Sequence, residues 1–203
     1  MGEKKEWEQL KLIKTSFHTY KYIFTDFDDT IIYTSYANFL AYKNAVHEIL
    51  NIDIAFIDER FTHNTLSQLE KDNNIINKII NLKNHCYSKY LQYTYPNNNL
   101  LDILKNHNNK IIVVTNGNKN RIENTLKYHN LQNQFHKRFY ITPSSQSLSK
   151  YLEVFNQLNE NNIKMEEIFI FENSELEILK ALNCGFKMDN ILKISPNIYR
   201  STL

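Results

Sequence analysis

Glycine, proline and cysteine are scarce in this sequence of 203 residues. Its three glycines and three prolines exclude a collagen-like chain and a flexible low-complexity chain, because both depend on these residues. The two cysteines, Cys86 and Cys184, lack the paired spacing of a zinc site or a disulfide framework, so we expect buried thiols. The rare glycines indicate special backbone positions, a tight turn after a strand at Gly117 and the C-terminal end of a helix at Gly185.

The sequence also lacks an excess of charge of one sign and any long apolar run. Its 24 Lys and Arg residues and 22 Asp and Glu residues give a formal net charge of +2. This balance provides no electrostatic footprint for nucleic acid or for an acidic membrane surface. Residues 1–20 are highly charged, and no later run has the length of a membrane span, so neither a signal peptide nor a membrane helix is predicted. We expect a cytoplasmic protein without a nucleic-acid or membrane partner, and the oligomeric state stays open.

Short apolar runs alternate with stretches of helical periodicity. The runs that predict strands are 20–25, 111–114, 138–142 and 167–171, and helices are expected at 118–128 and 147–158. Because each strand is almost continuously apolar and is followed by a helix, the pattern indicates a parallel sheet covered on both faces. The predicted fold class is therefore a doubly wound, Rossmann-like α/β core.

One long segment between the first two strands has only helical periodicity. Two apolar stripes with helical spacing occur there: Phe39, Tyr42, Val46 and Ile49, then Ile75, Ile79, Leu82, Cys86 and Tyr90. We predict an N-terminal extension at 1–19 with a short helix at 3–14, an α/β core formed by 20–34 and 96–203, and a small all-helical domain at 35–95.

Polar side chains follow three of the predicted strands. They are Asp26 and Asp28 after the first strand, Thr115 and Asn116 after the second, and Glu172 and Asn173 after the fourth. Doubly wound sheets bind ligands at the carboxyl ends of their strands, so these side chains predict one shared site.

The sequence Asp26-Phe27-Asp28-Asp29-Thr30 after a buried strand resembles the first motif of the haloacid dehalogenase superfamily. Three further family motifs have matches in the right order, namely Ile111 to Thr115 followed by Asn116-Gly117, Lys150, and Ile168 to Phe171 followed by Glu172-Asn173. The resemblance covers about Tyr22 to Lys187, and the helical segment looks like the cap domain that some members carry between the first two motifs.

The resemblance implies a phosphatase that acts on a small phosphorylated metabolite. Asp26 is then the nucleophile that forms an aspartyl-phosphate, and Asp28 first protonates the leaving group and then activates water. Thr115, Asn116, Lys150 and the backbone N–H groups of Phe27 and Asp28 bind the phosphoryl group.

A cation is also implied, because a carboxylate and a phosphate repel each other. Mg²⁺ suits oxygen ligands, and the resemblance assigns it to Asp26, the carbonyl of Asp28, and Glu172 or Asn173. Retention of Asp28 favours phosphoryl transfer over dehalogenation, which needs no leaving-group acid at that position.

Several departures from the family pattern leave alternatives open. Asn173 stands where a second acid is usual and could instead cap a helix that begins near Ser174. Glu175 or Glu177 could supply the missing charge, Lys164 or Lys187 could replace Lys150, and Asp29 stands where glycine is common. A phosphomutase or phosphotransferase with the same nucleophile, or a catalytically silent binding module, are the competing functions.

Overall fold

The computed structural model describes residues 19–56, 60–105, 110–142, 149–158 and 163–195. In that part of the chain, a five-stranded sheet has the order β5-β4-β1-β6-β7, and every neighbouring pair is parallel. Its strands are β1 (Tyr22–Thr25), β4 (Lys110–Thr115), β5 (Lys137–Tyr140), β6 (Ile168–Glu172) and β7 (Ile191–Lys193). The predicted parallel sheet is confirmed, with β1 at its centre.

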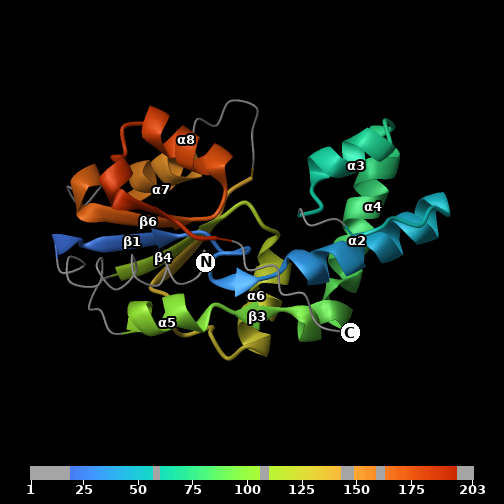
Figure 1. Cartoon of the computed structure of the whole chain (residues 1–203), viewed down its shortest axis with the longest axis horizontal. Helices are drawn as coiled ribbons and strands as arrows, with labels where there is room; N and C mark the ends of the chain where they lie inside the picture. The colour runs from blue at the N-terminus through green and yellow to red at the C-terminus, as the bar shows by residue number, and fades with distance from the viewer. Residues whose placement is uncertain (1–18, 57–59, 106–109, 143–148, 159–162, 196–203) are drawn as a thin grey trace.

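Helices cover both faces of this sheet, as Figure 1 shows for α5 on one side and α7 and α8 on the other. Their bounds are α5 (Asn98–Lys105), α6 (Lys119–Tyr128), α7 (Lys150–Leu158) and α8 (Glu175–Asn183). Ile23 of β1 packs with Leu101 of α5 and Ile122 of α6. Its neighbour Phe24 packs with Tyr151 of α7 on the opposite face, as the alternation of side chains along a strand requires. The doubly wound class is confirmed.

A helical insertion separates β1 from β4. The short strands β2 (Ile32–Tyr33) and β3 (Tyr95–Pro96) pair antiparallel at its base. Between them lie α2 (Ser35–Leu50), α3 (His63–Leu69), α4 (Asn73–Cys86) and the 3-10 helix η2 (Tyr87–Tyr93). Both predicted stripes contribute to its core, because Phe39 and Tyr42 of α2 pack with Ile79 of α4. The division into domains at 35 and 95 stays a prediction.

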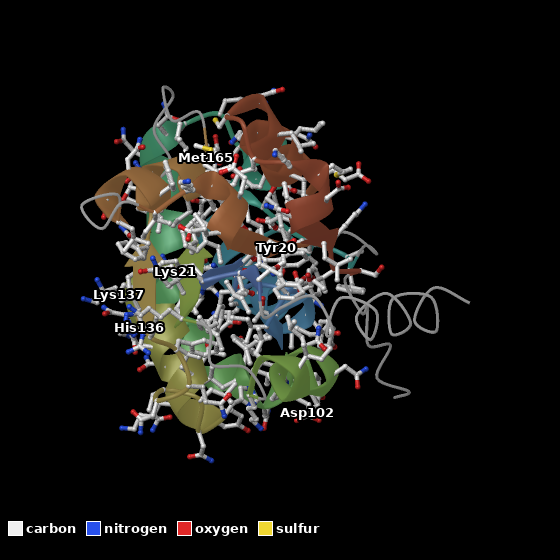
Figure 2. The ribbon with its side chains drawn as sticks, turned by 90° about the vertical axis from the view of Figure 1, so that its left-hand side faces the viewer. Tyr20, Lys21, Asp102, His136, Lys137 and Met165 are labelled. Carbon is white, nitrogen blue, oxygen red and sulfur yellow. The ribbon has the colours of Figure 1, made fainter. Side chains whose placement is uncertain are left out.

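The insertion lies at one end of the sheet (Figure 1). Figure 2 looks onto the opposite, amino-terminal edge, where Tyr20 and Lys21 precede β1 and where His136 and Lys137 mark the start of β5. The acids that follow β1 and β6 are therefore at the edge turned away from the viewer, on the side of the insertion. The 3-10 helix η2 contacts α6 and connects the insertion to the core.

Some element boundaries differ from the sequence prediction. The first strand begins at Tyr22 rather than Tyr20, and β6 runs one residue further, to Glu172. The edge strand β7 was not predicted, because three residues are too few to show a period. The helix expected at 3–14 and the start of the helix expected at 147 lie outside the described residues.

Gly185 has a φ of 100° just beyond the end of α8, so its predicted role at a helix terminus is confirmed. In the part of the chain that the structure describes, no helix combines the length and the apolar character needed to cross a membrane.

Candidate active site

Asp26 directly follows β1, the central strand, and is almost completely buried. Its backbone N–H donates to the carbonyl of Phe171 in β6 at 2.9 Å, which extends the sheet pairing by one residue. The next side chain, Phe27, is buried in the core. Alternation along the extended chain therefore turns Asp26 and Asp28 away from that core and into the cleft that they line.

Lys150, the first residue of α7, joins the first and fourth motifs. Its Nζ lies 2.5 Å from Asp26 Oδ1 and 2.7 Å from Glu172 Oε2. All three side chains are buried. Sequence reasoning did not identify Tyr151, whose hydroxyl donates to Glu172 Oε2 at 2.7 Å. The predicted Lys150 is thus brought together with Asp26 and Glu172.

The ionisation of this buried cluster depends on its one ammonium group. Burial raises the pKa of Asp26 to about 7, with Glu172 and Asp28 adding to the rise and Lys150 opposing it. Burial alone lowers the pKa of Lys150, but the carboxylates of Asp26 and Glu172 raise it above its ordinary value. Lys150 is therefore charged, and a further cation near Asp26 favours its nucleophilic, ionised form.

Asp28 is held by two arginines. Arg121 Nη1 donates to Asp28 Oδ1 at 2.7 Å, and Nη2 donates to Oδ2 at 2.5 Å. Arg60 Nη2 lies 3.2 Å from Oδ1, and the hydroxyl of Thr34 donates to the same oxygen at 2.6 Å. Burial alone raises the pKa of Asp28, but the guanidinium groups of Arg121 and Arg60 hold it well below its usual range. In this arrangement Asp28 is a carboxylate, and its low pKa makes it a weak base as long as both guanidinium groups hold it.

Sequence reasoning missed both arginines. Arg121 lies in the first turn of α6, the helix after β4, and a first-turn position at the carboxyl edge of a sheet is near the ligand cleft. That position is a signal that could have identified it. Arg60 lies in the insertion, far from any motif, and no sequence pattern marks it.

Asp29 links the acidic loop to the insertion. It has a φ of 61°, in the left-handed region, although it is not glycine. Its Oδ1 accepts from the backbone N–H groups of Thr34 and Ser35 at 2.8 and 2.9 Å. Its Oδ2 accepts from Arg60 Nη1 at 2.6 Å. The side chain of Thr34, the N-cap residue of α2, makes no capping hydrogen bond. The carboxylate of Asp29 accepts hydrogen bonds from N–H groups at the start of α2 in its place.

The second motif lies beside β1. Thr115 is the last residue of β4, and both Thr115 and Asn116 line the cleft. Thr115 Oγ1 accepts from the N–H of Gly117 at 3.0 Å. A Cβ atom at Gly117 would lie 2.5 Å from Arg121 Nη2. Space for the arginine is therefore the physical reason for glycine in this turn.

The fourth motif differs from its sequence interpretation. Glu172 Oε1 accepts from the N–H groups of Asn173 and Ser174, both at 2.8 Å, so both of its oxygens already have partners. Ser174, and not Asn173, is the N-cap of α8, so the capping alternative for Asn173 is wrong. Within the described residues, the one hydrogen bond that Asn173 Oδ1 accepts is a long bond of 3.4 Å from Thr30 Oγ1.

The donors available for a magnesium ion are all oxygens. Among the described residues, no group of three or more His, Cys, Asp or Glu side chains is arranged to hold a metal ion. Asp26, the carbonyl of Asp28 and the amide oxygen of Asn173 nevertheless fit Mg²⁺, which typically takes one or two carboxylates and keeps several waters. A role for Glu172 as a ligand, which stays a prediction, requires it to exchange a present hydrogen bond.

The alternative residues lie elsewhere or have other partners. Lys187 pairs with Glu166 in the 3-10 helix η4 (Met165–Glu167), and Lys164 is the N-cap of that helix. Figure 2 shows Met165 at the amino-terminal edge of the sheet. Exposed Glu175 pairs with Lys193. Glu177 lines the cleft and lies 2.8 Å from Lys180. Glu177 is therefore the better placed of the two compensating acids.

The candidate catalytic residues line one cleft of about 1120 Å³ between the carboxyl edge of the sheet and the insertion. The cleft includes Asp26, Asp28, Thr115, Lys150 and Glu172 on the core side, and Tyr42, Arg60 and Lys83 on the other. The fold and this site together define an enzyme of the Rossmann-like α/β class, with buried acids and cations gathered in one cleft at the carboxyl edge of its sheet.

Comparison with known proteins identifies the family. The model for haloacid dehalogenase-like hydrolases matches residues 22–191, so the chain belongs to this family. No curated protein sequence gave a significant match.

Solved structures agree on the fold. A haloacid dehalogenase-like hydrolase from Streptococcus pneumoniae is similar with a TM-score of 0.70 and 13% identity, over 89% of each chain. A predicted phosphoglycolate phosphatase from Haemophilus somnus gives a TM-score of 0.66 and 16% identity, over 82% of this chain and 83% of that one. CbbY from Rhodobacter sphaeroides, solved in complex with phosphate, gives 0.65 and 15%, over 83% and 84%.

Proposed function

We propose that the protein is a Mg²⁺-dependent phosphatase that hydrolyses small phosphomonoesters through an aspartyl-phosphate on Asp26. The observation that carries this proposal is the buried contact of Asp26 with Lys150 at the carboxyl end of the central strand. Phosphoryl transfer needs a positioned nucleophile and positive charge around the transferred group, and this cluster has both. The phosphatase names of several structural relatives point the same way.

The residues around Asp26 have complementary roles. Asp26 attacks phosphorus, and the ester oxygen leaves with a proton supplied by Asp28. Thr115 Oγ1 and Lys150 Nζ bind phosphoryl oxygens, together with Asn116. The backbone N–H groups of Phe27 and Asp28 can join them, because no hydrogen bond within the described residues uses either group.

The two proton transfers place different demands on Asp28. Asp28 is deprotonated while Arg121 holds it, so it has a place for a proton of the water that hydrolyses the aspartyl-phosphate, but it becomes basic enough only when this contact loosens. To protonate the leaving group in the first step, Asp28 must already have bound a proton, which also requires it to give up part of its contact with Arg121. An anionic substrate supplies a reason for this exchange, because it competes for the same guanidinium group.

Asp26, the carbonyl of Asp28 and Asn173 would hold Mg²⁺, which would supply positive charge to offset the repulsion between the nucleophile and the phosphate. Glu172 keeps Lys150 and Tyr151 in position through its hydrogen bonds. A helical cap over the cleft excludes water and contacts the leaving group.

The test is release of phosphate from p-nitrophenyl phosphate with and without Mg²⁺. We expect Asp26→Asn to lower kcat by at least about a thousandfold, because the substituted amide is a poor nucleophile. Asp102→Asn is the matched control, because Asp102 is an exposed acid on α5. Equal activity of Asp26→Asn and the wild type would exclude Asp26 as the nucleophile.

A second measurement separates an enzyme from a silent binding module. Mg²⁺ with beryllofluoride mimics the aspartyl-phosphate, so we expect it to raise the melting temperature of the wild type and not of Asp26→Asn. Absence of any shift in the wild type would favour the silent module.

A further inference from the structure

The cleft contains more positive charge than its carboxylates use. Arg60, Lys83 and Arg121 all line it near Asp28. Asp28 forms ion pairs with both arginines, and Asp29 forms a further ion pair with Arg60. Lys83 is left over on the wall formed by α4, opposite the candidate catalytic residues.

Lys83 is unusual because it is buried without a carboxylate. Its exposed fraction is 8%, and among the described residues it has neither an ion pair nor a hydrogen bond. Its Nζ lies 4.9 Å from the ring centre of Tyr42 and 5.7 Å from that of Tyr87. Aromatic faces attract an ammonium group but do not replace its hydration. The ammonium group faces the cleft and is only partly hydrated, so an anion in the cleft would stabilise it.

Arg121 points to the same place. Its guanidinium carbon lies 5.1 Å from the ring centre of Tyr87, the ring that Lys83 also faces. Its Nε is buried without a hydrogen-bond partner in the described part of the chain, and so is the hydroxyl of Tyr87. The guanidinium group of Arg121 and the ammonium group of Lys83 thus contact the same ring.

The surrounding charges agree with this arrangement. Burial, Arg121 and Arg60 lower the pKa of Lys83 to about 7, and Asp28 opposes them only in part. The group is therefore surrounded by an excess of positive charge. A second carboxylate or phosphate at this point would be attracted by the two guanidinium groups and would raise the pKa of Lys83, so that the lysine is charged and attracts it as well.

We propose that Arg60, Lys83 and Arg121 form a second anion subsite, and that the preferred phosphomonoester carries a second anionic group, a phosphate or a carboxylate. The assignment of the first group to Asp26 rests on the proposed function, whereas binding of an anion to the three cations does not. The leaving group is thus selected by its charge, and its second anion is held by both the insertion and α6.

Matched substrates test the proposal by kinetics. 3-Hydroxypropyl phosphate, propane-1,3-diyl bisphosphate and 3-phosphooxypropanoate differ only in the second terminal group, and homologues with two and four carbons vary the spacing. We expect wild-type kcat/KM to rise at least about tenfold when a phosphate or carboxylate replaces the hydroxyl at the best spacing. The comparison of the two anions tells which one the subsite prefers.

Variants connect this preference to Lys83. Lys83→Met should reduce the preference at least about fivefold, and Lys83→Arg should retain most of it. Lys78→Met is the matched control, because Lys78 is an exposed residue of the same helix. A wild-type preference below about twofold at every spacing would overturn the proposal, and so would an unchanged preference in Lys83→Met.

Binding to a protein that cannot turn over separates the two proposals. Titration calorimetry of propane-1,3-diyl bisphosphate into Asp26→Asn, and into the same protein with Lys83→Met, measures the subsite without catalysis. If binding depends on Lys83 while the wild type hydrolyses none of the esters, the subsite stands and the phosphatase proposal fails. If all the esters are hydrolysed equally well and the affinity for the bisphosphate is the same with and without Lys83, the phosphatase proposal stands and the subsite proposal fails.

Discussion

The contact between Arg121 and Asp28 gives the sharpest prediction on stability, and Arg121→Met tests it. Methionine keeps much of the apolar length of the side chain but removes the two hydrogen bonds of 2.7 and 2.5 Å. The exposed fractions of the side chains are 3% and 15%, so the substitution leaves a mostly buried carboxylate without its main partner.

The magnitude follows from the remaining partners of Asp28. Removing one member of a buried ion pair typically costs about 3–5 kcal/mol. Arg60 and Thr34 still contact Asp28, so we expect a somewhat smaller loss than this, about 2–4 kcal/mol of unfolding free energy. For a chain of this size that lowers the melting temperature by about 5–15 °C.

Urea unfolding of four proteins measures this loss: the wild type, Arg121→Met, Asp28→Asn and the double variant. The double variant should recover part of the stability, because no uncompensated charge is left, and the cycle gives the coupling between the two side chains. Arg138→Met is the control, because Arg138 forms a partly exposed ion pair with Glu123 at 2.8 Å and should contribute less than about 1 kcal/mol. A loss in Arg121→Met no larger than that of Arg138→Met would refute the reasoning.

Two further predictions concern the neighbours of this pair. Gly117→Ala should lower the unfolding free energy by about 1–3 kcal/mol in urea unfolding, because the added Cβ displaces Arg121. The loss should be smaller in an Arg121→Met background. Equal losses in both backgrounds would contradict this explanation. The pKa of Lys83 is about 7 in the folded protein and 10.5 ordinarily, so between these pH values Lys83 binds fewer protons in the folded than in the unfolded protein. The unfolding free energy of the wild type should therefore rise relative to that of Lys83→Met from pH 7 to pH 9, by at most about 1.4 kcal/mol per pH unit. A pH-independent difference between these two proteins would show that Lys83 keeps an ordinary pKa.

The fold was predictable because its signals are local. Runs such as 111–114 are short and apolar at every position, as a strand buried on both faces requires. The helical insertion was equally clear, because its stripes repeat over several turns. The three-residue strand β7 was missed, since its pairing with β6 and not its own pattern makes it a strand.

The candidate site was predictable in part. The motifs identified Asp26, Thr115, Lys150 and Glu172 before any contact was known, and the structure brings these side chains to one cleft. They could be found because each follows or begins an element whose end lies at the carboxyl edge of the sheet.

Other side chains could not be assigned from the sequence. Arg60 lies more than thirty positions from Asp28 in the chain, and its ion pair depends on how the insertion packs. Lys83 looks like an ordinary surface residue of an amphipathic helix, but its exposed fraction is 8% because the cleft closes around it. Asp29 seemed a neutral replacement for glycine, whereas it anchors the start of α2.

The sequence by itself determined the doubly wound class, the helical insertion and the family, because periodicity and motif order are properties of neighbouring residues. Only the tertiary structure decided the electrostatics of the site: that Asp28 is held as a carboxylate by Arg121, that Glu172 is already occupied by Lys150 and Tyr151, and that Lys83 is buried unpaired. Charges act through space and their strength depends on burial, so these properties exist only once distant parts of the chain are packed together.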